Sequence, residues 1–135
     1  MLQKVWIVPC SGIGKTYGSI ARESAFIVTE DLRPQSTRIL ALSRLVPEGS
    51  DVHHEIQHSG CITIDGCKLS CAAKVVAAAG GTITHALQVL EVYRAHPKLK
   101  PAGIAELNEG GKMLAKALAR EVAALVDAME AKQDA

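Results

Sequence analysis

The hydrophobic positions of this chain alternate between the spacings typical of strands and of helices, and they predict a series of short elements. An apolar run predicts a strand over Lys4 to Val8, which Pro9 ends. A helix is expected to begin near Thr16 and to stop at Pro34. Alternating β-branched and aliphatic side chains predict a second strand over Thr37 to Leu42.

The middle of the chain continues this alternation. Residues 51–59 predict a short helix, Ile62 to Asp65 a third strand, and the alanine-rich segment Leu69 to Ala79 another helix. The apolar positions over Ala86 to Val92 fit either a strand or a helix. We interpret that segment as the fourth strand.

The C-terminal part has the clearest helical pattern, which predicts a long amphipathic helix over about residues 108–132. The apolar positions step by three and four residues: Leu114, Leu118, Val122, Leu125 and Met129. Strands that alternate with helices predict an α/β fold with right-handed crossovers. We therefore expect a three-layer sandwich with a small, mostly parallel four-stranded sheet and a long C-terminal helix.

Composition narrows the class of protein. A chain of 135 residues has the length of one domain, residues 1–135, and can bury a core without disulfides or metal. The net charge of +1 gives no electrostatic footprint for nucleic acid, so we expect no nucleic-acid partner. The first apolar stretch is too short for a signal peptide or a membrane span. These features indicate a soluble cytoplasmic protein that does not associate with membranes.

The candidate chemistry lies in four cysteines: Cys10, Cys61, Cys67 and Cys71. In a reducing compartment, clustered thiols serve more often as metal ligands or redox centres than as structural bridges. Cys10 follows the first predicted strand and Cys67 the third. If those strands are neighbours, about 4.8 Å apart, the loops after them bring both sulfurs to one metal ion at the carboxyl edge of the sheet. A helix beginning near Cys67 would add Cys71 on the same face.

Cys61 fits this site less easily, because it precedes the strand that Cys67 follows. Six extended residues span roughly 20 Å, whereas thiolates lie about 2.3 Å from zinc. Either the strand is short or bent, or Cys61 is a buried core residue outside the site. A further alternative joins Cys61 to His54 and His58, although two exposed histidines are the simpler interpretation of that pair.

The loop after the first strand offers other chemistry. Gly14, Lys15 and Thr16 are similar to the end of a phosphate-binding loop, but Pro9 stands where that motif needs its first glycine. A cysteine phosphatase would need arginine where Thr16 stands. A helix N-terminus beside Lys15 nevertheless favours an anion or a thiolate at Cys10. A thiol enzyme that uses Cys10 as nucleophile or redox centre, resolved by Cys67 or Cys71, is therefore an alternative, although the chain has no Cys-x-x-Cys.

Several segments resemble the family named after its Asp-Gly-Cys motif, the DGC domain family, over roughly the first hundred residues. The matching residues are Pro9 to Gly14, Ile20 to Arg22, Ile64 to Cys67, Cys71, Ala72 and Lys74. The resemblance implies zinc binding through Cys10, Cys67 and Cys71. It also implies a further cysteine just after the second strand, where this chain has Ser43, which leaves three thiolates and an open coordination position.

Other interpretations stay open at this stage. Thiolates also bind iron or an iron–sulfur cluster. The metal could be carried, sensed or presented to a substrate as a Lewis acid, so the sequence does not decide whether the protein is an enzyme. We expect Asp65 to hold the ligand loop by accepting hydrogen bonds from loop amides. A third hypothesis is a regulatory or partner-binding module that forms a homodimer through the C-terminal helix.

Overall fold

The computed structural model describes residues 4–10, 12, 14–47, 49, 51–66 and 68–133. The strands are β1 (Val5–Pro9), β2 (Thr37–Ile39), β3 (Gly60–Asp65) and β4 (Thr82–Gln88). The α-helices are α1 (Thr16–Phe26), α2 (Asp51–Gln57), α3 (Cys71–Ala78), α4 (Val89–Ala95) and α5 (Glu109–Gln133). Three shorter helical segments are η1 (Ile27–Leu32), a π-helix, and the 3₁₀ turns η2 (Leu42–Leu45) and η3 (Pro97–Leu99).

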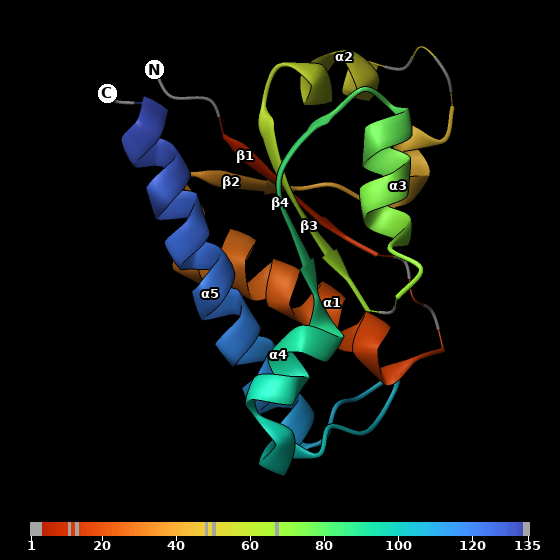
Figure 1. Ribbon diagram of the computed structural model, residues 1–135, viewed down its shortest axis with the longest axis vertical. Coiled ribbons are helices and arrows are strands. Elements are labelled where there is room, and N and C mark those ends of the chain that lie inside the picture. The colour runs from red at the N-terminus through yellow and green to blue at the C-terminus, as the bar shows by residue number, and fades with distance from the viewer. Residues whose placement is uncertain are drawn as a thin grey trace.

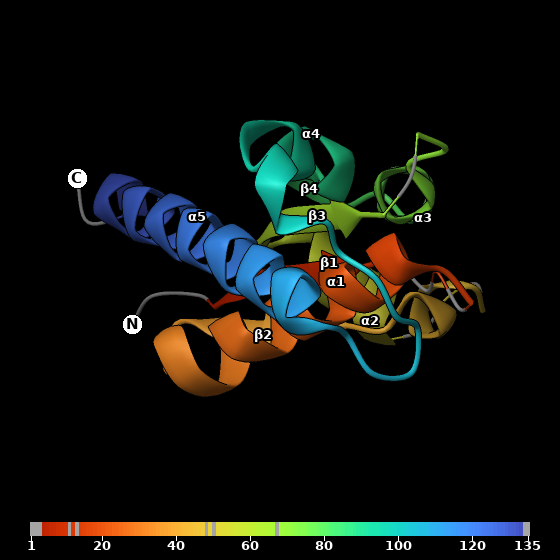
Figure 2. The ribbon, with the colours of Figure 1, turned by 90° about the horizontal axis from the view of Figure 1, so that it is seen from below.

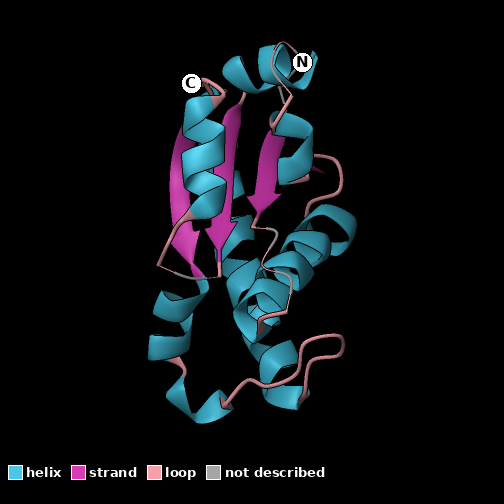
Figure 3. Cartoon of the chain, turned by 90° about the vertical axis from the view of Figure 1, so that its right-hand side faces the viewer, coloured by secondary structure: helices cyan, strands magenta, loops and turns pink. Residues whose placement is uncertain are grey.

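The four strands form one parallel sheet in the order β2-β1-β3-β4 (Figure 1). Helix α5 lies on one side of the sheet, where it packs on α1 and η1, and α2 and α3 lie on the other side (Figure 2). Figure 3 shows the α3 layer in front of the strands. The predicted three-layer α/β fold with a four-stranded sheet and a long C-terminal helix is confirmed, and within the described residues every strand pair is parallel.

The core lies on both faces of β1 and β3. Ile7, Val8, Ile62 and Ile64 are fully buried there, because helices cover both sides of a parallel sheet. Trp6 is 3% exposed, and the guanidinium of Arg38 lies 4.5 Å from the centre of its ring. This stacking covers the indole at the β2 side of the sheet.

The apolar side of α5 packs against other elements of the same chain. Leu114, Leu118, Val122 and Val126 are fully buried, and the helix packs on α1 and η1. Arg33, just after η1, donates two hydrogen bonds of 2.7 Å to the carboxylate of Asp127 and so ties the two elements together at the surface. The helix predicted at about residues 108–132 is confirmed at Glu109–Gln133.

Two predicted boundaries are wrong. The second strand ends at Ile39, because the chain turns into η2 at Leu42 after only three residues of pairing with β1. The segment predicted as a strand over Ala86 to Val92 is the end of β4 followed by α4. Val89 and Val92 are both buried three positions apart, which is helical spacing. None of the described helices combines the length and the apolar character needed to cross a membrane.

Candidate metal and thiol site

The carboxyl ends of β1 and β3 lie side by side, where the sequence places its reactive groups. Pro9 pairs with Ile64, and the amide of Cys10 donates a 2.8 Å hydrogen bond to the carbonyl of Ile64. The chain leaves β1 toward α1 on one face of the sheet and leaves β3 toward α3 on the other. Such a switch point opens a crevice outside the strand ends, which is where ligands bind in doubly wound folds. The condition that the sequence analysis set for the site, that the first and third strands are neighbours, is met.

The sulfur of Cys10 contacts the backbone after β3. The amide of Gly66 donates a hydrogen bond to Cys10 Sγ at 3.1 Å, and Cys10 is only 6% exposed. The sulfur thus accepts a hydrogen bond from a backbone donor, which both a neutral thiol and a thiolate can do. Cys10 therefore contacts the residue that directly precedes Cys67 in the sequence. Cys67 itself lies outside the described residues, as do Ser11 and Ile13 of the first loop.

Two glycines allow this close approach. A Cβ atom at Gly18, inside α1, would collide with the carbonyl of Gly12, and one at Gly66 would lie 2.8 Å from the amide nitrogen of Gly18. The backbones of the first loop, the start of α1 and the end of β3 are therefore packed against one another. The sequence does contain a signal for this junction, since glycine in a helix interior costs stability and needs a packing reason.

Asp65 holds the start of α3. Its carboxylate is 2% exposed and accepts hydrogen bonds from the amides of Ala72 at 2.7 Å and Ala73 at 3.2 Å. These amides belong to the first turn of α3 and have no partner within the helix, so a buried anion there is favoured by hydrogen bonding and by the helix dipole. Asp65 was expected to bond loop amides, and the structure shows that it bonds the helix start instead. Gln88 adds a 2.8 Å hydrogen bond to the hydroxyl of Ser70.

Cys71 is the first residue of α3 and is exposed. The helix begins at Cys71 and not at Leu69, where the sequence pattern predicts its start, because Lys68 and Leu69 form a turn and Ser70 adopts the left-handed φ of 53°. The condition under which Cys67 and Cys71 would share a helical face, a helix that begins near Cys67, is not met. Cys71 still lies at the carboxyl edge, one residue before the amides that Asp65 binds.

Cys61 lies at the other end of β3. It pairs with Trp6, near the start of β1, and is four residues before Asp65, a separation of about 13 Å along a strand. The thiol is fully buried and donates a 3.7 Å hydrogen bond to the carbonyl of Ser59. Burial raises the pKa of Cys61 to about 12, so the group is a neutral thiol at physiological pH. The structure thus places Cys61 away from Cys10.

His54 lies on α2 and His58 directly follows that helix. The rings of His54 and His58 lie edge to face with their centres 4.8 Å apart. They form no metal-binding group with Cys61. Across the part of the chain that the structure describes, which leaves out Cys67, no three His, Cys, Asp or Glu side chains gather as a metal site.

Space for a small molecule lies on both sides of Cys10. A pocket of about 420 Å³ is lined by Cys10, Lys15 to Gly18, Gly12 and Gly66, within the range of ligand sites. A smaller apolar hollow of about 190 Å³ lies toward β2, between Cys10 and Leu40, with Arg22 and Phe26 at its side. The thiol therefore borders a cavity even though its own exposure is small.

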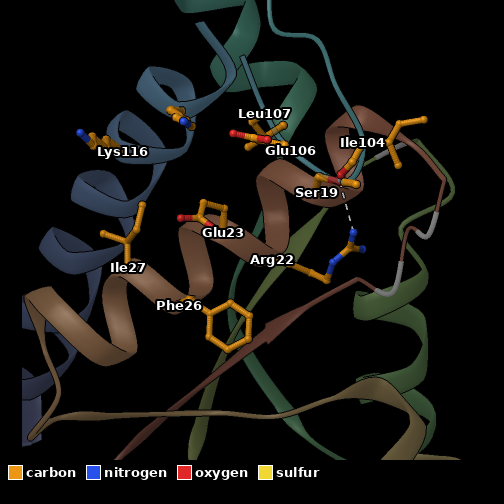
Figure 4. A pocket seen from close by; sticks show the side chains of 11 residues that line it. Ser19, Arg22, Glu23, Phe26, Ile27, Ile104, Glu106, Leu107 and Lys116 are labelled. Carbon is orange, nitrogen blue, oxygen red and sulfur yellow. Dashed lines mark hydrogen bonds between the residues drawn. The ribbon is translucent and has the colours of Figure 1, made fainter. Parts of the chain in front are cut away.

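A separate hollow of about 370 Å³ lies between α1, residues 104–107 and the start of α5 (Figure 4). The Ser19 hydroxyl donates a 2.6 Å hydrogen bond to the carbonyl of Ile104, and Arg22 donates one of 3.3 Å to Ser19. These bonds fix the loop before α5 to α1. Since Arg22 and Phe26 also line the hollow beside Cys10, the two cavities share a wall.

Fold and site together define a doubly wound α/β protein with a cysteine at the switch point of a parallel sheet. The comparison with protein families gives the same result as the motif: the DGC domain matches residues 6–110. The chain belongs to the DGC domain family. Searches of curated proteins and of solved structures found no significant match.

Proposed function

We propose that this protein binds a zinc ion through the thiolates of Cys10, Cys67 and Cys71 at the carboxyl edge of its sheet. The observation that carries the proposal is the 3.1 Å hydrogen bond from the Gly66 amide to Cys10 Sγ. It brings the cysteine after β1 next to the Asp65–Gly66 turn that leads into Cys67. Backbone amides that donate to sulfur are a common supporting shell for thiolate ligands, because they offset negative charge.

The donor set fits the metal chemically. Thiolates are soft ligands that favour zinc, and three of them leave a fourth coordination position open. A zinc ion with an open coordination position would act as a Lewis acid, or would be exchanged with a partner. Hydrogen bonds within the chain position two of the proposed ligands. Asp65 fixes the start of α3 and therefore Cys71, whereas Gly66 fixes Cys10.

Elemental analysis of protein purified without added metal tests this proposal. We expect about one zinc per chain, released when the thiols are blocked, and a colourless protein. Cys10→Ser and Cys71→Ser should each lower the zinc content, whereas Cys61→Ala, the matched control at the far end of β3, should retain it. The proposal is wrong if Cys10→Ser keeps its zinc, and a brown protein would indicate an iron–sulfur cluster instead.

The pocket of about 420 Å³ beside Cys10 favours a second candidate, a thiol enzyme with Cys10 as its nucleophile. Lys15 and the N-terminal end of α1 line the same pocket, and both stabilise negative charge on sulfur. Alkylation of metal-free protein at a range of pH values separates the two functions. A reactive Cys10 would be modified well below pH 8, whereas an ordinary thiol with a pKa near 8.5 would eliminate this candidate.

A further inference from the structure

The hollow of about 190 Å³ beside Cys10 combines a thiol and a cation with apolar walls. It lies between the end of β1, helix α1 and the chain that leaves β2. Among the described residues that line it, Arg22 is the only charged one. The apolar walls come from Phe26, Ile39, Leu40 and Leu42. Because sites for drug-sized ligands measure roughly 300–1,000 Å³, this hollow suits a smaller molecule.

Arg22 is held in the wall of this hollow by a hydrogen bond on its own helix. Its guanidinium donates to the hydroxyl of Ser19 at 3.3 Å (Figure 4), and that hydroxyl donates to the carbonyl of Ile104 at 2.6 Å. A guanidinium has five N–H donors in a planar fork, so the bond to Ser19 is compatible with a further acceptor such as a carboxylate. Arg22 is also half-buried, and a cation in that position attracts an anion more strongly than an exposed one, because less water screens it.

The acidic side chains of this region line a different cavity. The hollow of about 370 Å³ on α1 is lined by charges of both signs: Glu23, Glu106, Lys112 and Lys116, besides Arg22. Figure 4 shows the side chains of Arg22 and Glu23 leaving α1 in different directions. Within the described residues, the hollow beside the thiol therefore contains one positive charge and no negative side chain.

The other walls of the hollow suit a short hydrocarbon chain. Leu40 and Leu42 are buried, and Ile39 is partly buried against the core. Phe26, by contrast, is a large aromatic residue that is 43% exposed. A ligand that covers the Phe26 ring removes apolar surface from water, which favours its binding. The lining is therefore complementary to a molecule with an anionic group at one end and an aliphatic body.

We infer that this hollow binds a small aliphatic carboxylate, with Arg22 as the residue that selects the anion. The guanidinium pairs with the carboxylate, the chain of the ligand contacts Phe26 and Leu40, and the ligand lies against the thiol of Cys10. The inference rests on the proposed function, because it names the class of substrate that Cys10, or a zinc ion held by Cys10, would meet. Arg22 contacts the ligand and not the metal, so it is a specificity residue.

Alkylation of the reduced, metal-free full chain with iodoacetate and with iodoacetamide tests this inference. The two reagents have nearly the same shape and both alkylate a thiolate with loss of iodide, but only iodoacetate carries a carboxylate. Peptide mapping gives the rate at each cysteine, and the ratio of the iodoacetate rate to the iodoacetamide rate cancels the thiolate fraction. We expect Arg22→Gln to lower this ratio at Cys10 about tenfold, the effect of one hydrogen bond to a charged group. The ratio at Cys71, the control within the same sample, should not change.

Two further variants locate the anion. Arg22→Lys keeps the positive charge and should retain most of the preference for iodoacetate. Lys15→Gln removes a cation from the pocket of about 420 Å³ on the other side of Cys10, and it should lower the ratio less than Arg22→Gln does. An equal or larger effect of Lys15→Gln would place the anion in that pocket and overturn the inference. A ratio at Cys10 that Arg22→Gln leaves unchanged overturns it as well.

A protection experiment on the unmodified protein does not depend on whether the variants fold. At matched ionic strength, excess butyrate should slow the reaction of Cys10 with iodoacetamide, whereas butyramide, which has the same shape without the charge, should not. Equal protection by both compounds, protection by neither, or a Cys10 that neither reagent modifies overturns the inference.

The zinc content of the same preparations separates this inference from the proposed function. Arg22→Gln should bind as much zinc as the unmodified protein. If Cys10→Ser keeps its zinc while the preference for iodoacetate depends on Arg22, only the zinc proposal fails. If zinc binding requires Cys10 but the preference does not depend on Arg22, only the carboxylate site fails.

Discussion

The buried carboxylate of Asp65 offers the sharpest test of how this site is built. Asp65→Asn keeps the size of the side chain but replaces one acceptor oxygen with an NH₂ group, which cannot accept from a helix amide. One of the two hydrogen bonds, to Ala72 at 2.7 Å or to Ala73 at 3.2 Å, is then lost. The other bond loses its charged acceptor.

The magnitude follows from these contacts. A hydrogen bond to a charged group contributes about 1.5–3 kcal/mol, and a neutral one about half as much. Loss of one charged bond and weakening of the second should therefore lower the free energy of unfolding by about 2–4 kcal/mol. This loss is a large part of the free energy of unfolding of a typical domain, which is roughly 5–15 kcal/mol.

Urea unfolding followed by circular dichroism, on reduced protein with a chelator, measures this loss without a contribution from bound metal. Asp127→Asn is the matched control. Its carboxylate, 53% exposed, binds Arg33 at the surface, where screening leaves little net stabilisation, so we expect a much smaller loss. If the two variants lose the same stability, Asp65 does not act as a buried helix cap and our account of how α3 is positioned is wrong.

Three further predictions concern packing and the thiols. Gly18→Ala should destabilise the fold by about 1–3 kcal/mol in the same assay, because its methyl group meets the backbone of Gly12, and an unchanged midpoint would refute the close approach. Thiol labelling of native protein, with the modified residues identified by peptide mapping, should find exposed Cys71 modified quickly and Cys61 only after unfolding; rapid labelling of Cys61 itself would contradict its buried position. Above pH 9.0 the unfolded chain loses the Cys61 proton that the folded chain keeps until its pKa of about 12, so stability should fall as pH rises through this window. The contribution is at most about 1.4 kcal/mol per pH unit, and Cys61→Ala should show a correspondingly shallower decline than the unmodified protein.

The sheet could be predicted from the sequence, because each strand is a short apolar run. The close approach of the loops after β1 and β3 could be predicted as well, because each crossover has only one usual hand. The boundary between β4 and α4 could not, since the apolar positions over Ala86 to Val92 fit either element, and only the burial of both Val89 and Val92 decides for a helix. The start of α3 at Cys71 also depends on a contact between residues that are separated in the sequence. Asp65 reaches seven residues along the chain to Ala72, and no local propensity reports that bond.

The candidate site was predictable to a similar extent. The position of Cys10 after β1 follows from the strand pattern, whereas its hydrogen bond with Gly66 depends on glycines that allow three segments to touch. Cys61 shows the opposite case: its place before the predicted third strand already separated it from the other thiols, and the parallel register with Trp6 fixes it at the far end of the sheet. Zinc binding by Cys10, Cys67 and Cys71 stays a prediction.

The single tryptophan gives this protein an intrinsic optical reporter. Trp6 is buried in β1 beneath the guanidinium of Arg38, four residues before Cys10 on the same strand and loop. Its emission should shift to longer wavelength when water reaches the indole. Fluorescence titrations can therefore follow opening of the central strand, or metal uptake that perturbs it, in unlabelled material at low concentration.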